Sequence, residues 1–487
     1  MSPIEAPEMP IPFGISADTG QPLEGIDDAA LDSFKVNGHN GAVAKEYLEA
    51  KAESTEPNFG TIGDVDSSQL DQAGWAVIFS PSADQKIREA LQPLLDHRKA
   101  QVGDENLFKI FEGPSGYQPD DTATTWLRRP PRNVRMDVVD PQLGVPYYIL
   151  IVGPPDEIPF EFQYALDLYW AVGRLWFPTA DEFRQYADSV IRYETMPAVP
   201  TSRQMTVFAT RHDFDAATQL FSSEVAEPLV QGLGRVAAVG QRQKFGLQPF
   251  IGDPATKDSL LRILSGSIDN GPPALLFTGG HGKSFRPDDP RQEGSQGALI
   301  CQDWAGYGKV ERDAYFDASD LPANAKVHGM VHFLFACYGG GCPQFDNFNR
   351  LQEGAPKTIA PKPMMARLPQ ALLAHPDGGA LAVLAHIDRA WAYSFRSGSQ
   401  GQIQGFRDVV GRIMRGERLG MATDQFNIRW AALSTELSEV LDQMRVGLQV
   451  DPKKLANQWV ARDDARNYVL FGDPAVRLRT EDMPALA

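Results

Sequence analysis

The stretch ALLFTGGHGKSF (274–285) is an apolar run that changes abruptly into glycines around a histidine. Its first residues are typical of a buried strand, and TGGHG (278–282) then stands where that strand ends. Gly282-Lys283-Ser284 also fits the last positions of a phosphate-binding loop, G-x-x-x-x-G-K-[ST]. However, the first glycine of that motif would fall at Phe277, and the prolines and glycines that follow Ser284 cannot open a helix. We therefore favour a site built on the histidine over a nucleotide site.

A second apolar run ends in a similar way. KVHGMVHFLFAC (326–337) is typical of a buried strand, and FACYGGGCP (335–343) continues it with a cysteine and three glycines. In open parallel sheets, binding and catalytic residues collect at the carboxyl ends of the strands. If these two strands are neighbours, His281 and Cys337 face one crevice.

A cysteine and a histidine at one strand edge are suited to nucleophilic catalysis. A nearby histidine activates a thiol by taking its proton or lowering its pKa. The backbone N–H groups of Gly282 and Cys337 could form an oxyanion hole, and His281 could donate a proton to the leaving amine. The sequence identifies no carboxylate that would orient His281.

The rest of the chain predicts an α/β fold with a mostly parallel sheet flanked by helices. Short apolar runs alternate with segments of helical periodicity. The predicted strands include WAVIFS (75–80), PYYILIVG (146–153), RQMTVFAT (203–210), KFGLQPFIG (244–252) and GALAVLAHID (379–388). We divide the chain into an extended or partly disordered N-terminal segment (1–70) and two α/β units (71–240 and 241–487). A regulatory or inhibitory role for the first segment is compatible with its composition.

Composition excludes several classes of function. The net charge of −17 disfavours a nucleic-acid surface and an anionic membrane surface. No stretch reaches the about 18 apolar residues of a spanning helix, and no secretory leader is recognisable. Three cysteines form no disulfide framework, and the histidines and cysteines lack zinc spacing. We expect a cytoplasmic protein without a metal or cofactor.

The two motifs resemble those of the caspase-like clan of cysteine peptidases, which includes caspases, legumains, separases, gingipains and bacterial CHAT proteins. The order of YYILIVGPPDEIP (147–159), AVGRL (171–175), LLFTGGHG (275–282), FLFACYGGG (333–341) and YVLFGDPAVRL (468–478) is most similar to the gingipain type. The resemblance spans about residues 74–480. It implies two tandem caspase-like units, the first without catalytic residues and the second with a dyad of His281 and Cys337. Neither secretion nor calcium binding carries over.

The resemblance also implies where a substrate pocket would lie. The strand after the nucleophile helps to form this pocket in the clan, which points to HIDRAWAYSF (386–395). Asp388 could pair with a substrate Arg or Lys, and Trp391 could stack on its aliphatic stem. The alternative is that Asp388 pairs with other groups of the protein.

Other cysteines and histidines fit structural roles better. Cys342 is a rival nucleophile that three glycines carry away from the strand end, and Cys301 fits ordinary packing in a strand. His328 and His332 have the spacing of a metal pair only on a helix, and their segment is predicted to be a strand. His386 is predicted to pack near the site.

The sequence thus predicts a cysteine endopeptidase that acts on a protein or peptide substrate through an acyl-enzyme, with cleavage after a basic residue as a finer expectation. Activation by a regulatory protein, a ligand or self-cleavage would act on the long loops 283–325 and 339–363. The alternatives are a catalytically silent caspase-fold scaffold or sensor and, less favoured, a nucleoside triphosphatase that uses Lys283.

Overall fold

The computed structural model describes residues 11–25, 60–234, 236–350, 356–397 and 400–484. Most of the predicted N-terminal segment, residues 1–10 and 26–59, lies outside the described residues.

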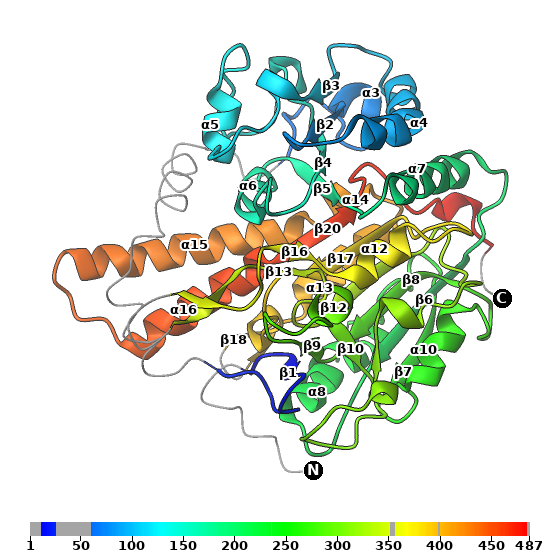
Figure 1. The fold of residues 1–487 in the computed structure, drawn as a ribbon, viewed down its shortest axis with the longest axis vertical. Helices are drawn as coiled ribbons and strands as arrows, with labels where there is room; N and C mark the ends of the chain where they lie inside the picture. The colour runs from blue at the N-terminus through cyan, green and yellow to red at the C-terminus, as the bar shows by residue number, and fades with distance from the viewer. Residues whose placement is uncertain (1–10, 26–59, 235, 351–355, 398–399, 485–487) are drawn as a thin grey trace.

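The core of the molecule is a ten-stranded sheet (Figure 1). Its central strands are buried on both faces, as expected where helices cover a parallel sheet on both sides. In spatial order the strands are β3 (Phe108–Phe111), β2 (Trp75–Phe79), β4 (Tyr148–Val152), β5 (Ala171–Leu175), β20 (Tyr468–Gly472), β17 (Ala382–His386), β12 (Val331–Phe335), β8 (Pro273–Gly279), β6 (Ser202–Ala209) and β7 (Gly246–Ile251).

Every neighbouring pair in this sheet is parallel except β17 and β20. This confirms the predicted α/β class and the mostly parallel sheet. Strands from both predicted units join in this one ten-stranded sheet, and β6, which was predicted to belong to the first unit, lies between β7 and β8. The division into two units at residues 240 and 241 stays a prediction.

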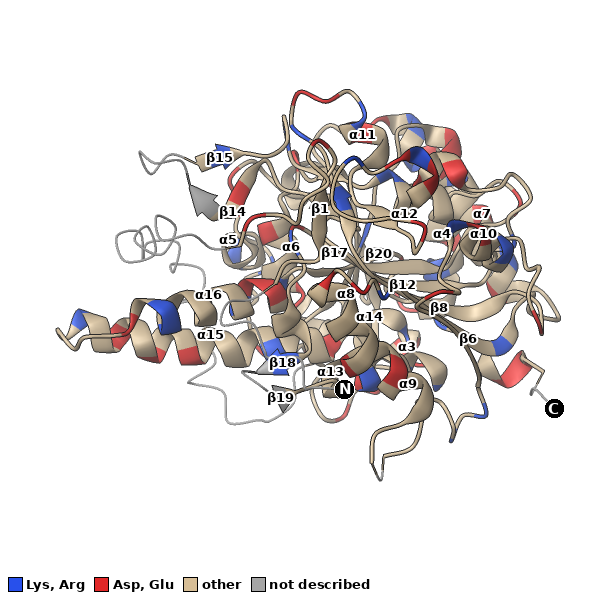
Figure 2. Cartoon of the chain, turned by 90° about the horizontal axis from the view of Figure 1, so that it is seen from below, with Lys and Arg blue, Asp and Glu red and all other residues tan. Residues whose placement is uncertain are grey.

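The larger helices pack around this sheet. They are α4 (Gln85–Val102), α7 (Ala180–Thr195), α10 (Lys257–Leu264), α12 (Arg367–Leu373), α13 (Gln404–Met414), α15 (Asp424–Arg445) and α16 (Pro452–Arg466). Helices α15 and α16 lie side by side and extend away from the body of the molecule, with acidic and basic residues distributed along them (Figure 2). None of the described helices combines enough length with enough apolar character to cross a membrane.

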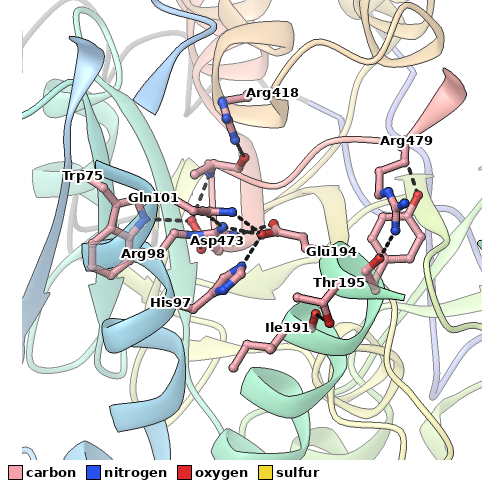
Figure 3. A network of polar contacts seen from close by, with 12 residues as sticks. Trp75, His97, Arg98, Gln101, Ile191, Glu194, Thr195, Arg418, Asp473 and Arg479 are labelled. Carbon is pink, nitrogen blue, oxygen red and sulfur yellow. Dashed lines mark hydrogen bonds and ion pairs between the residues drawn. The ribbon is translucent and has the colours of Figure 1, made fainter. Parts of the chain in front are cut away.

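A buried ion-pair network connects Asp473, the residue after β20, to helices α4 and α7 (Figure 3). The Arg98 guanidinium of α4 donates to Asp473, which follows β20, at 2.7 Å and to Glu194 of α7 at 2.6 and 2.8 Å. Trp75 of β2 donates its indole N–H to the same aspartate at 3.0 Å. Arg98 and Asp473 are fully buried, and a buried ion pair that loses one partner leaves an uncompensated charge in the interior.

A smaller four-stranded sheet lies beside the site. It contains β1 (Gly14–Ser16), β9 (Gly282–Ser284), β10 (Ala298–Ile300) and β11 (Tyr315–Phe316). Strand β1 runs parallel to β9, so that Gly14 lies opposite Gly282. The N-terminal segment is thereby brought next to the strand that follows His281. Residues 283–325, predicted as a loop, contain three of these short strands, and their regulatory role stays a prediction.

Candidate active site

The two glycine-flanked strand ends meet at one edge of the large sheet. Strands β8 and β12 pair in parallel with Gly279 opposite Phe335, and the N–H of Gly280 donates to the Phe335 carbonyl at 3.1 Å. The expectation that His281 and Cys337 share a crevice depended on these strands being neighbours, and in the structure they are. Gly282 is required by this approach, because a Cβ there would lie 1.9 Å from the Cys337 carbonyl oxygen.

The two backbone N–H groups predicted to form an oxyanion hole converge on one oxygen atom. The amides of Gly282 and Cys337 both donate to the carbonyl of Phe13, at 3.0 Å each. Two donors on one carbonyl oxygen are the arrangement that stabilises the negative charge of a tetrahedral intermediate. The position of Phe13 was not predicted, because the segment around it shows no periodicity.

The Cys337 thiol lies directly beside this carbonyl group. A Cβ built on Gly14, the residue after Phe13, would be 3.0 Å from Cys337 Sγ. The thiol is fully buried, and the N–H of Ala390 lies 3.2 Å from Sγ. Burial raises the pKa of Cys337 well above its usual value, more than this hydrogen bond lowers it. With Phe13 and Gly14 in place, burial thus favours the neutral thiol form of Cys337.

His281 is positioned by a carboxylate that the sequence analysis did not identify. Its Nε2 lies 2.9 Å from Asp215 Oδ2, and its Nδ1 has no hydrogen-bond partner among the described residues. Burial alone would raise the pKa of Asp215, but His281 and the Thr218 hydrogen bonds hold it well below its usual value. Asp215 also accepts a hydrogen bond from the Tyr307 hydroxyl at 3.0 Å. The carboxylate therefore leaves Nδ1 as the nitrogen available for proton transfer.

Asp215 is held in turn by the local structure of its own segment. It is the N-cap of α8 (Ala216–Phe221) and accepts from the Thr218 N–H at 2.8 Å. Asp is a preferred N-cap residue, because its carboxylate can accept a hydrogen bond from a free backbone N–H of the first turn. Its proximity to His281 follows from β6 lying beside β8, and this strand order is not encoded in any local pattern.

The predicted pocket residues lie near the site but make contacts of other kinds. The carboxylate of Asp388 accepts from the Asn347 side chain at 2.8 Å and from the Arg389 N–H at 2.8 Å. The Trp391 ring packs against Phe348, 5.1 Å between ring centres, in a cluster with residues of α15 and α16. The backbone of residues 390–392 contacts residues 11–13, as described below.

The other cysteines and histidines singled out in the sequence make structural contacts, and all of them except the half-buried His328 are buried. Cys342 lies 3.7 Å from the Gln296 amide nitrogen, and Cys301 packs in the hydrophobic core. His332 is 2.9 Å from the Thr278 hydroxyl, whereas His328 is 3.0 Å from the Ser189 carbonyl. His386, predicted to pack near the site, lies 3.0 Å from the Asp464 carbonyl and is fully buried.

Lys283 lies in a strand, not in a loop before a helix. Its side chain is almost fully buried, and its Nζ donates to the Val310 carbonyl at 3.4 Å and lies 3.7 Å from the Tyr315 ring centre. Burial lowers the pKa of Lys283 to about 8. Gly282–Ser284 therefore lacks the helix N-terminus that a phosphate-binding loop requires.

Comparisons with known proteins agree with the resemblance in the sequence. The model of peptidase family C25 matches residues 71–479. The Arg-specific cysteine proteinase gingipain R is 14% identical, with a TM-score of 0.48 over 84% of this chain and 79% of its own. The complex of the pro- and mature domains of RgpB from Porphyromonas gingivalis is 12% identical, with a TM-score of 0.44 over 84% of this chain and 80% of the other. No curated protein sequence matches significantly.

Proposed function

The chain belongs to peptidase family C25 and is a cysteine peptidase, and on this premise we propose that it is an endopeptidase whose catalytic dyad is Cys337 and His281. The observation that carries the proposal is the Phe13 carbonyl, which accepts from the Gly282 and Cys337 amides at 3.0 Å each beside the Cys337 thiol. A substrate carbonyl bound in the same way would be polarised toward attack.

The proposed reaction has two steps. In the first, the Cys337 thiol gives its proton to His281 while sulfur bonds to the substrate carbonyl carbon, and the carbonyl electrons move to the oxygen held by the two N–H groups. The C–N bond then breaks, and the amine leaves with the proton from His281. In the second step, water adds to the thioester with His281 as the base, and the C–S bond breaks to release the acid and restore the thiol.

Asp215 is the positioning residue for His281 in this reaction. Its carboxylate holds Nε2 at 2.9 Å, which leaves Nδ1 as the ring nitrogen that would exchange the proton. The charge of Asp215 also favours the imidazolium that forms when the thiol loses its proton.

The test is hydrolysis of unfolded casein and of a peptide library, with cleavage sites identified by mass spectrometry. Because residues 13 and 14 cover the Cys337 thiol, the assay is run on the full chain and on the Phe13→Asp variant, in which this contact is weakened. We expect cleavage by at least one of them, and loss of cleavage in Cys337→Ala and His281→Ala. Cys301→Ala, which changes another buried cysteine, is the matched control and should cleave normally.

Absence of cleavage by both folded forms would contradict the proposal and favour the scaffold alternative. Cleavage that survives Cys337→Ala would contradict the assignment of the nucleophile. For the residue before the scissile bond, the sequence analysis proposed Arg or Lys, recognised by Asp388. That carboxylate already accepts two hydrogen bonds, from Asn347 and from the Arg389 amide, so the contacts of Phe13 are the better guide to the pocket.

A further inference from the structure

We propose that residues 11–14 occupy the substrate groove in the register of a bound substrate, and that the pocket around Phe13 selects a large apolar, preferably aromatic, residue before the scissile bond. This inference rests on the proposed peptidase function and specifies its substrate class. It also identifies the part of the chain that blocks the site.

The backbone of this segment makes the hydrogen bonds that an extended peptide would make. Phe13 N–H donates to the Ala390 carbonyl at 2.9 Å, and the Ala392 N–H donates to the Ile11 carbonyl at 3.3 Å. Pro12 lies opposite Trp391 in an antiparallel bridge. Together with the two donors on the Phe13 carbonyl, these contacts fix the register through the main chain alone, as in peptide recognition by strand addition. The Phe13–Gly14 bond is thereby placed at the thiol.

The side chain of Phe13 fills an apolar cage. Its ring is fully buried and lies 5.0 Å from the Phe335 ring, 5.8 Å from Phe395 and 5.9 Å from Phe221, each with an edge-to-face geometry. These three phenylalanines come from the end of β12, the segment after β17 and the end of α8. The centre of the His281 ring is 6.0 Å from that of the Phe13 ring.

Such a cage discriminates by size and by charge. Three aromatic rings offer contact to another ring, whereas a Lys or Arg would bring its charge out of water among them. Because a single missing methylene in an apolar pocket already costs about 10- to 200-fold in specificity, Phe should be preferred over Ala by at least about 10-fold.

The residue after the bond is restricted as well. A Cβ at position 14 would lie 2.9 Å from Cys337 Cβ and 2.4 Å from Leu23 Cδ1, so only glycine fits in this arrangement. Gly14 then begins β1, and its carbonyl accepts from the Leu23 N–H at 2.9 Å. The chain is therefore held on both sides of the Phe13–Gly14 bond, which keeps the segment in the groove and other substrates out.

The experiment compares the unmodified full chain with Phe13→Asp, and uses Phe13→Leu as the matched control that keeps an apolar side chain in the cage. The substrates are internally quenched peptides of the form Ile-Pro-X-Gly-Ile-Ser, with X as Phe, Leu, Ala, Lys or Arg. A second readout, independent of hydrolysis, is the alkylation rate of Cys337 by iodoacetamide. Cys301 and Cys342 are internal controls.

We expect Phe13→Asp to raise both the alkylation rate of Cys337 and the hydrolysis of the Phe peptide by at least about 10-fold. Both rates are proportional to the fraction of molecules in which residues 11–14 have left the groove. The Phe peptide should exceed the Ala, Lys and Arg peptides by at least about 10-fold in kcat/KM. A synthetic peptide of residues 10–18 should inhibit the variant, and the same peptide with Lys at position 13 should not.

Two results would overturn the inference. Preference for Lys or Arg would refute the apolar pocket and leave the peptidase function intact. Equal alkylation of Cys337 in the unmodified and Phe13→Asp chains would refute the occupation of the groove, whether or not hydrolysis occurs. Hydrolysis by neither form, together with faster alkylation in Phe13→Asp, would refute the peptidase activity while supporting the occupied groove.

Discussion

Replacement of Asp215 by Asn should lower kcat strongly while it leaves the fold intact. Asn is as good an N-cap as Asp, so the start of α8 and its hydrogen bond from Thr218 should persist. What changes is the contact with His281 Nε2, 2.9 Å away. Because Thr218 N–H and His281 Nε2 meet the same atom, Oδ2, the amide oxygen of Asn can keep both contacts, but a neutral amide no longer favours the imidazolium.

The magnitude follows from this single contact. A hydrogen bond to a charged group contributes about 1.5–3 kcal/mol. If the whole of it is lost in the transition state, kcat falls about 10- to 150-fold, since each 1.36 kcal/mol is a factor of ten. KM should change little, because the segment that lies in the groove is held by backbone groups of residues 282, 337, 390 and 392.

The assay is steady-state hydrolysis of the best quenched peptide by the form of the chain that cleaves it. Asp213→Asn is the matched control, because Asp213 is exposed and lies two residues away. A kcat for Asp215→Asn within threefold of the parent, or an equal loss in Asp213→Asn, would refute the positioning role. Thermal denaturation of each variant verifies that the fold is retained.

Three further predictions concern the frame of the site. Arg98→Met should lower the free energy of unfolding by about 3–5 kcal/mol in urea denaturation, because it leaves buried carboxylates unpaired; a loss below 1 kcal/mol would contradict this. Burial raises the pKa of Asp167 to about 7, so this group contributes stability below about pH 4 that is lost as pH rises through about 7, and Asp167→Asn should flatten that decline in Tm. An equally steep decline in the variant would contradict this reasoning. Gly282→Ala should lower kcat about 10²–10³-fold by displacing an oxyanion donor from beside Cys337, whereas Gly294→Ala, with open space around it, should not; equal effects would argue against the close approach.

His281 and Cys337 could be predicted as site residues because each follows a single continuous segment with a recognisable strand pattern. The run before His281 and the run before Cys337 are continuous apolar strands, and parallel strands carry their following residues to a common edge. Their adjacency could therefore be anticipated. The convergence of the two amide donors depends on the glycine next to His281, because a Cβ at Gly282 would collide with the Cys337 carbonyl.

The parts that were missed depend on the order of strands or on segments without a pattern. Asp215 reaches His281 because β6 pairs with β8, and no sequence periodicity gives strand order. Phe13 lies in a segment whose composition predicted extended chain, and only the partners offered by Ala390 and β9 define its place. The family resemblance implied that Trp391 lies at a pocket wall; its backbone pairs with Pro12, but its ring packs with residues of α15 and α16.

Strand β20 has a consequence for how the molecule is made. Its residues are translated after all the other strands, yet it lies between β5 and β17 in the middle of the sheet. Until β20 is synthesised, β5 and β17 each have one edge without a hydrogen-bonded neighbour. Such unpaired strand edges pair with other chains and lead to aggregation. A chain that ends before residue 468 would lack β20, so that the sheet would be divided into two parts between β5 and β17. The cell therefore obtains a working sheet from this gene only when translation has run through residue 472.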